Sequence, residues 1–161
     1  MAKKILITGA NGFLGSAVSK LALKKGFVVN VLVRKNSNCE NLKNIASKFN
    51  FFFGDIRDVE SIHNPIKQSD VIFHIAADYR LWARKTSEIY ESNVYGTENI
   101  ALKVLELNKK LIYTSSVATL GLKDGVESDE NTPVSLSDMI GDYKKSKFLA
   151  GNEYSVADIA T

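Results

Sequence analysis

The sequence is poor in cysteine and in charge of a single sign, and each scarcity excludes a class of protein. Cys39 is the only cysteine among 161 residues, which excludes an internal disulfide and a structural zinc cluster. Lys and Arg number 21 against 18 Asp and Glu, a net charge of +3, and the basic residues are scattered. A nucleic-acid binder usually concentrates such charge on one face or in one run. We therefore expect no nucleic-acid partner.

The sequence also lacks a long apolar run. No stretch approaches the roughly 18 residues that a membrane-spanning helix needs, and the apolar part of "MAKKILITGA" is too short for a signal peptide. We expect a cytoplasmic protein without a membrane span. A hydrophobic content of 45 % and a charged content of 24 % are ordinary for a globular domain, and the length fits one domain.

Short β-branched runs alternate with helical patterns along the chain. The runs that predict strands are residues 4–8, 28–34, 49–55, 70–77 and 110–116. Helices are expected after the first run up to Gly26, over residues 87–107, and from about Gly141. Such alternation indicates crossover units and a parallel sheet. The expected fold is a doubly wound α/β domain.

A glycine-rich stretch, "TGANGFLG" at residues 8–15, ends the first expected strand and opens a helix. Gly9, Gly12 and Gly15 provide a sharp turn, close approach of backbone to phosphate and tight packing of helix on strand. The helix N-terminus supplies unpaired N–H groups for an anion. A turn without a ligand is the alternative, but the strand before the loop and the helix after it favour a dinucleotide site.

The residue after the second expected strand discriminates between cofactors. An acid there would bind both ribose hydroxyls and repel a 2′-phosphate, whereas this strand ends in Val33, Arg34 and Lys35. Arginine presents a planar fork that matches phosphate, so NADP is favoured, with NAD as the second choice. An ordinary surface arginine is the alternative reading of Arg34. Asp55, after the third strand, would lie near the adenine or cap the next helix.

Tyr143 and Lys147 are four residues apart, so they share a face of the last expected helix. A phenol has a reference pKa near 10, and acid–base work at neutral pH needs its phenolate to be stabilised, most simply by an ammonium. Ser116, at the end of the fifth expected strand, would lie where ligands of such sheets bind. A solvated helix face is the alternative for the pair taken alone. His74 lies within an apolar strand and is read as core; no metal site is expected.

"TGANGFLG", "NVYGT", "YTSSVATLG" and "YKKSK" together resemble the extended short-chain dehydrogenases/reductases, the NAD-dependent epimerase/dehydratase group. "HIAADYRLWA", "SSVATLG" and "DMIGDYKKSKFLA" are similar to hopanoid-associated sugar epimerases and dihydroflavonol reductases. The resemblance covers residues 3 to about 150. It implies that Ser116, Tyr143 and Lys147 are catalytic, with adjacent Ser115 as the alternative serine.

The same resemblance implies the cofactor contacts. These are Gly9, Asn11, Gly12, Phe13, Leu14, Gly15, Arg34, Asp55, Ile56, Ala76, Ala77, Asn93, Tyr143 and Lys147. Asn93 matches an asparagine that helps to order the active site. Tyr79, Arg80 and Trp82 would contact a sugar nucleotide or pack their own loop.

Members of the group continue past the catalytic helix with further strands and a substrate domain. We therefore expect residues 1–161 to be a truncated Rossmann fold, the NAD(P)-binding amino-terminal portion of a longer enzyme. The expected function is epimerase or reductase chemistry on a nucleotide-sugar or a related hydroxyl or carbonyl substrate. The alternatives are a dinucleotide-binding module without turnover and a protein that acts by association. Dimerisation through the long helix and the last helix would follow the family.

Overall fold

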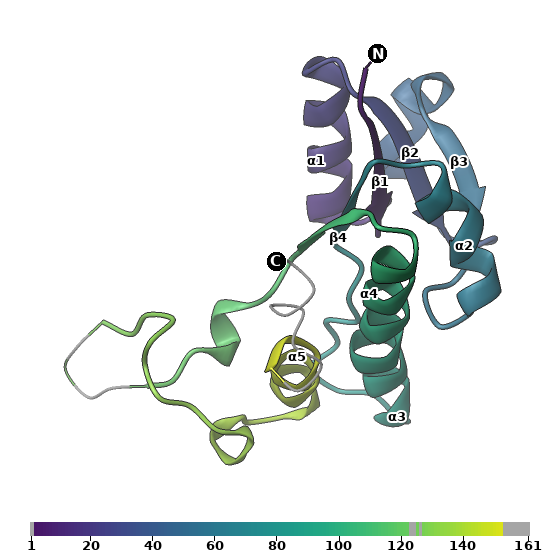
Figure 1. Ribbon diagram of the computed structural model, residues 1–161. Helices are drawn as coiled ribbons and strands as arrows, with labels where there is room; N and C mark the ends of the chain where they lie inside the picture. The colour runs from purple at the N-terminus through teal and green to yellow at the C-terminus, as the bar shows by residue number, and fades with distance from the viewer. Residues whose placement is uncertain (1, 123–124, 126, 153–161) are drawn as a thin grey trace.

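Five strands form one parallel sheet in the computed structural model, which describes residues 2–122, 125 and 127–152 (Figure 1). The sheet order is β3-β2-β1-β4-β5, and every neighbouring pair runs parallel. The strands are β1 (Lys4–Thr8), β2 (Val28–Val33), β3 (Asn50–Phe53), β4 (Val71–His74) and β5 (Lys110–Tyr113). The predicted doubly wound Rossmann-like fold is confirmed.

Helices cover both faces of this sheet. They are α1 (Phe13–Lys24), the 3₁₀ helix η1 (Glu40–Lys48), α2 (Val59–Lys67), α3 (Ser87–Tyr90), the π-helical turn η2 (Glu91–Tyr95), α4 (Gly96–Glu106), the short turns η3 (Val117–Thr119) and η4 (Leu136–Asp138), and α5 (Asp142–Asn152). Figure 1 shows α1 on one side of the sheet and α2 with α4 on the other. The described residues that follow η3 project away from the sheet, and those around η4 lead the chain back to α5 (Figure 1).

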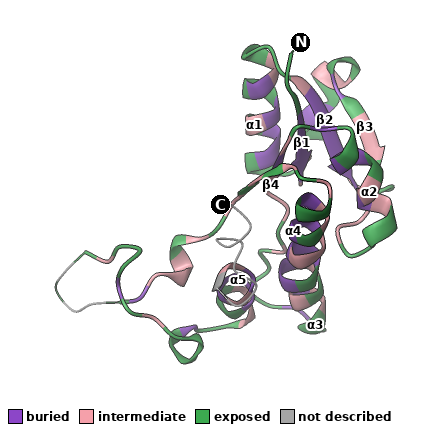
Figure 2. Ribbon diagram, in the orientation of Figure 1, coloured by how far each residue is buried: buried purple, intermediate pink, exposed green. Residues whose placement is uncertain are grey.

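The two faces of the sheet bury two separate apolar clusters. One contains Ile5, Ile7 and Val31 packed against Ala22 of α1 and Leu42 of η1. The other contains Leu6, Leu32, Ile72, Ile62, Ile66, Ile100 and Val104 and joins the sheet to α2 and α4. Because adjacent side chains of a strand point to opposite faces, consecutive apolar residues in β1 serve both clusters. Figure 2 shows the resulting buried centre of the sheet.

The long helix predicted over residues 87–107 is present from Ser87 to Glu106, but it is not uniform. A π-helical turn of five residues, Glu91–Tyr95, interrupts it. Such turns occur often at functional sites, and this one carries Asn93. The stretch before β3, for which the sequence pattern predicts no element, forms η1, with Leu42 fully buried.

Within the described residues, β5 pairs only with β4, so it is an edge strand. Four strands end one to three residues earlier than the sequence pattern predicts, because the last residues leave the ladder to form the loops of the site. No helix in the described part of the chain combines the length and apolarity needed to cross a bilayer.

Candidate functional site

A cleft of about 960 Å³ opens at the carboxyl ends of the strands, and loops after all five strands line it. Ligands of open α/β sheets bind at this edge. The cleft brings together most of the predicted site residues, namely Gly9, Asn11, Gly12, Phe13, Leu14, Gly15, Arg34, Asp55, Ile56, Ala76, Ala77, Tyr143 and Lys147. Ser116 and Asn93 are the two that do not line it.

The glycine loop is closely packed at its two ends and open in the middle. Gly9 has a positive φ of 66°, and a Cβ there would lie 2.8 Å from Ala76 Cα. A Cβ on Gly15 would overlap the Gly9 carbonyl. Gly12 is exposed, and the nearest atom to a Cβ there is Gly9 O at 3.3 Å. Gly9 and Gly15 therefore serve packing, while a side chain at Gly12 would fill the space in front of the loop.

The first turn of α1 faces this space with unpaired donors. Gly12 is its N-cap and offers no side-chain cap, and the first turn holds no acidic residue. The first N–H groups of a helix have no partner within it and carry a partial positive charge. The loop therefore fits a pyrophosphate, which would occupy the space that the missing Gly12 side chain leaves.

Two asparagines hold the glycine loop against the segment after β2. Asn11 Nδ2 donates to the Asn38 carbonyl at 2.8 Å, and Asn41 Nδ2 donates to the Asn11 carbonyl at 2.9 Å. The phosphate-facing loop and the loop that begins at Arg34 are thus joined by two hydrogen bonds. A ligand that spans both loops meets a surface that is already assembled.

Arg34 is exposed on the wall of the cleft next to the end of β2. Asp55 does not cap the following helix, because Asp58 is the N-cap of α2 and accepts from Glu60 N. The Asp55 carboxylate instead accepts two hydrogen bonds from the Arg57 guanidinium, at 2.9 and 2.7 Å. Hydrogen bonding from Arg57 lowers the pKa of Asp55 below its ordinary value. Arg57 is thereby occupied, and Arg34 has no ion pair among the described residues.

A second arginine fork follows β4. Arg80 donates to the Asp78 carboxylate through Nε at 2.9 Å, and Arg80 Nη2 lies 2.9 Å from Glu88 of α3. The hydrogen bonds from Arg80 lower the pKa of Asp78. Tyr79 is 79 % exposed and Trp82 is 77 % exposed, so these rings do not pack their own loop. Tyr79 and Arg80 line the cleft, whereas Trp82 does not.

The predicted pair lies on one face of α5, as its spacing requires, and both side chains line the cleft. Lys147 is only 2 % exposed. Its Nζ donates to the Tyr113 hydroxyl and, at 2.8 Å, to the Thr114 carbonyl. Burial lowers the pKa of Lys147 to about 8. The carboxyl end of β5 therefore fixes the position of the Lys147 amine in the cleft that Tyr143 also lines.

The two adjacent serines after β5 differ in position. Ser115 is exposed and lines the cleft. Ser116 is half-buried and is the N-cap of η3, where its Oγ accepts from Ala118 N at 3.2 Å. A hydroxyl that accepts in this way still has its own hydrogen to donate. Both serines stay candidates for a bond to a reacting oxygen.

Sequence reasoning missed several residues that line the cleft: Gly54, Asp78, Glu88, Ser92 and Thr114. Asp78 and Glu88 matter because they hold Arg80, from two positions before it and eight positions after it, and no motif predicts this arrangement. Thr114 contributes its carbonyl, which side-chain chemistry cannot predict. Their positions in loops directly after predicted strands are the one feature of the sequence that could have identified these lining residues.

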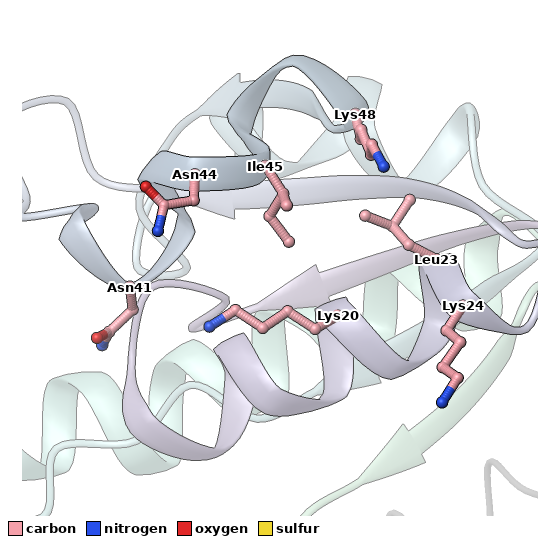
Figure 3. A pocket seen from close by; sticks show the side chains of 7 residues that line it. All are labelled: Lys20, Leu23, Lys24, Asn41, Asn44, Ile45 and Lys48. Atoms are coloured by element: carbon pink, nitrogen blue, oxygen red, sulfur yellow. The ribbon is translucent and has the colours of Figure 1, made fainter.

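A second hollow, of about 530 Å³, lies between α1 and η1 (Figure 3). Lys20, Lys24 and Lys48 line it with two asparagines and two apolar residues, and the ammonium groups of Lys20 and Lys24 point in different directions in Figure 3. It contains none of the predicted site residues. Among the described residues no group of three or more His, Cys, Asp or Glu is placed to hold a metal ion.

The fold and the cleft define a Rossmann-like α/β protein with a glycine-loop site. The sequence model of the NAD dependent epimerase/dehydratase family matches residues 5–155, and the chain belongs to this family. The crystal structure of gox2253 is 42 % identical, with a TM-score of 0.86, over 94 % of this chain and 46 % of that one.

Two curated relatives are also similar. A protein of Synechocystis sp. (strain ATCC 27184), named "Putative dihydroflavonol 4-reductase", is 36 % identical over 95 % of this chain and 44 % of its own length. The N-acetyl-alpha-D-glucosaminyl-diphospho-ditrans,octacis-undecaprenol 4-epimerase of Escherichia coli O157:H7 is 32 % identical over 93 % of this chain and 42 % of its own length. The chain therefore spans less than half the length of these relatives.

Proposed function

We propose that residues 1–161 form the NAD(P)-binding domain of an epimerase or reductase that acts on a nucleotide-sugar or a related hydroxyl or carbonyl compound. One observation carries the proposal: a single cleft joins the glycine loop after β1 to Tyr143 and Lys147 on α5. The last residue of this loop, Gly15, stands 128 positions before Tyr143 in the sequence. A loop that served only to begin α1 would have no need of a tyrosine–lysine pair in the same cleft.

The glycine loop and the first turn of α1 would hold the pyrophosphate through backbone N–H groups. When bound, the nicotinamide supplies hydride transfer to or from a substrate carbon. Tyr143 Oη moves the proton of the substrate hydroxyl, and the Lys147 ammonium stabilises the phenolate that forms. The hydroxyl of Ser116, or of Ser115, donates to the reacting oxygen.

Arg34 supports a preference for NADP. Its guanidinium lies on the cleft wall after β2, where a carboxylate would select NAD. The other two arginines near this wall, Arg57 and Arg80, are paired with Asp55 and Asp78. Arg34 is therefore the one arginine of this wall that needs no rearrangement to bind a 2′-phosphate.

The substrate class follows the relatives. The Escherichia coli relative is named as an epimerase of a sugar carried on a diphosphate, and a Bacillus cytotoxicus relative, 31 % identical over 75 % of this chain, is named UDP-N-acetyl-alpha-D-glucosaminuronate decarboxylase. Arg80 and the exposed Tyr79 ring would face such a substrate from the loop after β4. Epimerisation returns the hydride to the substrate, whereas reduction leaves the cofactor oxidised.

Calorimetric titration of the chain with NADPH and with NADH tests the cofactor assignment. We expect both to bind and NADPH to bind more tightly. Absence of heat and of any thermal stabilisation with both cofactors would overturn the proposal. UDP-sugars added to the NADP⁺ complex, and carbonyl compounds added to the NADPH complex, then separate the reactions. An epimerase converts a UDP-sugar to its epimer with no net change in cofactor absorbance, whereas a reductase consumes NADPH in step with its carbonyl substrate.

The second candidate function is that of a dinucleotide-binding module without turnover. It is favoured by the small share of its relatives' length that the chain covers. Substrate positioning alone contributes about 7–11 kcal/mol to many reactions, and the relatives have more than half of their length beyond the matched part. NADPH binding without conversion of any UDP-sugar would support this function.

A further inference from the structure

Lys147 is held by the protein before any ligand arrives. Its Nζ bonds to the Tyr113 hydroxyl and the Thr114 carbonyl, and it lies 4.1 Å from the centre of the Tyr113 ring. An ammonium has three N–H groups, so two are directed to the end of β5 and one remains. Packing does not explain the Tyr113 hydroxyl, because a phenylalanine would fill the same space and keep the ring contact.

The Tyr113 ring packs against the ring of His74. The two rings stack, with centres 5.7 Å apart and planes 24° from parallel. His74 is fully buried, and its ring nitrogens contact two threonines: Nδ1 lies 2.7 Å from Thr8 Oγ1, and Nε2 lies 3.0 Å from Thr97 Oγ1. A buried polar ring held on both sides has one orientation.

The backbone sets the direction of these bonds. Thr8 Oγ1 accepts from the amides of Ile75 and Ala76, at 3.2 and 3.1 Å. The single hydroxyl hydrogen of Thr8 must then go to His74 Nδ1, so the ring proton is on Nε2 and is donated to Thr97. Burial, and secondarily the charge of Lys147, lowers the pKa of His74 to about 3, so the ring stays neutral.

The Tyr113 side chain lies between His74 and Lys147. Its ring stacks on the His74 ring, and its oxygen accepts a hydrogen bond from the Lys147 ammonium. Burial raises the pKa of Tyr113 to about 12, which keeps the phenol neutral, while hydrogen bonding from Thr97 opposes this rise. Hydrogen bonds therefore run from the amide of Ala76, beside Gly9, through Thr8 to His74, and the stacked Tyr113 ring connects His74 with the amine of Lys147.

We propose that Tyr113 is a positioning residue for Lys147: its phenol oxygen, on a ring stacked against His74, holds the ammonium in the cleft and links β5 to α5. The proposal rests on the proposed function for the importance of Lys147. It concerns the ligand-free protein, so its test needs no cofactor. Failure of NADPH binding would overturn the proposed function and leave this arrangement standing.

The test removes one oxygen atom. Tyr113→Phe keeps the ring, its stacking on His74 and its contact with Lys147, and deletes only the acceptor. The pKa of Lys147 is measured by carbon NMR on lysine labelled at Cε, with Lys147→Met to assign its signal. Loss of a hydrogen bond to a charged group should lower this pKa by a further one to two units, roughly.

Tyr90→Phe is the matched control, because the Tyr90 hydroxyl donates to Asp142 and does not contact Lys147. Tyr113 contacts Lys147, His74 stacks on Tyr113, and Tyr143 lines the same cleft from α5; the control changes none of these groups. An unchanged Lys147 pKa in Tyr113→Phe, or an equal shift in Tyr90→Phe, would overturn the proposal.

A measurement on the unmodified protein guards against a variant that does not fold. In ¹⁵N-lysine spectra near pH 6, we expect one ammonium signal that exchanges slowly with water and shows a nuclear Overhauser effect to the Tyr113 ring. Only fast-exchanging lysine signals, without contact to that ring, would contradict the arrangement.

Discussion

Asn93 Nδ2 donates a 2.9 Å hydrogen bond to Ser146 Oγ, which joins the π-helical turn of the long helix to the turn of α5 between Tyr143 and Lys147. The same amide closes a pair of bonds with the backbone of Asp78, accepting from its N–H at 2.6 Å and donating to its carbonyl at 2.8 Å. One buried side chain therefore connects the loop after β4, the long helix and α5. Asn93 does not line the cleft; it supports three segments that do.

Removal of this amide should weaken the whole fold. Asn93→Ala leaves two backbone groups of Asp78 without partners, at a cost of about 1–3 kcal/mol for each buried group, so we expect a loss of ~2–4 kcal/mol in the free energy of unfolding. Ser146→Ala should cost about 1 kcal/mol. Urea denaturation followed by circular dichroism measures both. Asn44→Ala, at an exposed asparagine in the second hollow, should change little; equal losses in all three variants would contradict the assigned role.

Arg34→Ala should weaken NADPH and spare NADH. The loss of a charge-assisted hydrogen bond to a 2′-phosphate corresponds to about 1.5–3 kcal/mol, whereas NADH lacks that phosphate. Arg57→Ala is the matched control, because Arg57 is occupied by Asp55. Calorimetric titrations of the three proteins decide the matter. Equal affinities for the two cofactors in the parent would show that Arg34 is an ordinary surface residue.

Two glycines of one loop should fail in different ways. Gly12→Val places a branched side chain in the exposed space before α1, so we expect cofactor binding to vanish while the fold largely survives. Gly15→Ala forces a Cβ against the Gly9 carbonyl, so we expect the fold itself to lose stability. Thermal unfolding with and without NADPH separates the two effects. NADPH binding retained by Gly12→Val would mean that the loop is only a turn.

His74 should make the fold sensitive to mild acid. Its folded pKa, lowered by burial to about 3, lies below its unfolded value near 6.5, so the unfolded state binds more protons between these limits. Stability is then fully present above about pH 6.5 and falls as the pH decreases toward 3. At about 1.36 kcal/mol per unit, the loss between pH 7 and pH 5 should be about 2 kcal/mol. Asp55 and Asp78, whose pKa values are also lowered, add their own losses only in more acidic solution.

Comparison of urea midpoints at pH 7 and pH 5 measures this dependence. His74→Gln should be less stable at both values, since it disturbs the bonds to Thr8 and Thr97, but its stability should depend less on pH. A variant with an unchanged slope would assign the acid sensitivity to other groups.

The sequence predicts the sheet well because β-branched runs report burial on both faces, and the residues of β1, Lys4–Thr8, are found as expected. It predicts η1 and the π-helical turn poorly. The η1 segment is mostly polar, so it shows no clear apolar periodicity. The π-helical turn arises where Asn93 bonds to Asp78 and Ser146, and these tertiary contacts are not visible in the local sequence. Glycine spacing and the Tyr143–Lys147 interval place the site because both encode local geometry.

Pairings across the fold are what local patterns omit. Nothing in the residues around Tyr113 shows that its hydroxyl meets Lys147, which stands 34 positions later in the chain. The sequence does not distinguish Ser115 from Ser116 for a similar reason. Adjacent residues after a strand point in different directions, and only the path of the loop decides which one faces the cleft.

Tyr143→Phe should separate binding from chemistry. The phenyl ring keeps the shape of the cleft wall, so we expect NADPH affinity to change by no more than about twofold. Conversion of UDP-sugars should fall by a factor of about 10²–10⁴, the usual contribution of a positioned acid–base group. Ser116→Ala and Ser115→Ala, compared in the same assay, should differ. The variant that lacks the serine bonded to the reacting oxygen should lose turnover, and the other variant should keep most of it. Turnover undiminished in Tyr143→Phe would remove the proton-transfer role from this residue, and with it the reason for placing Lys147 at its side.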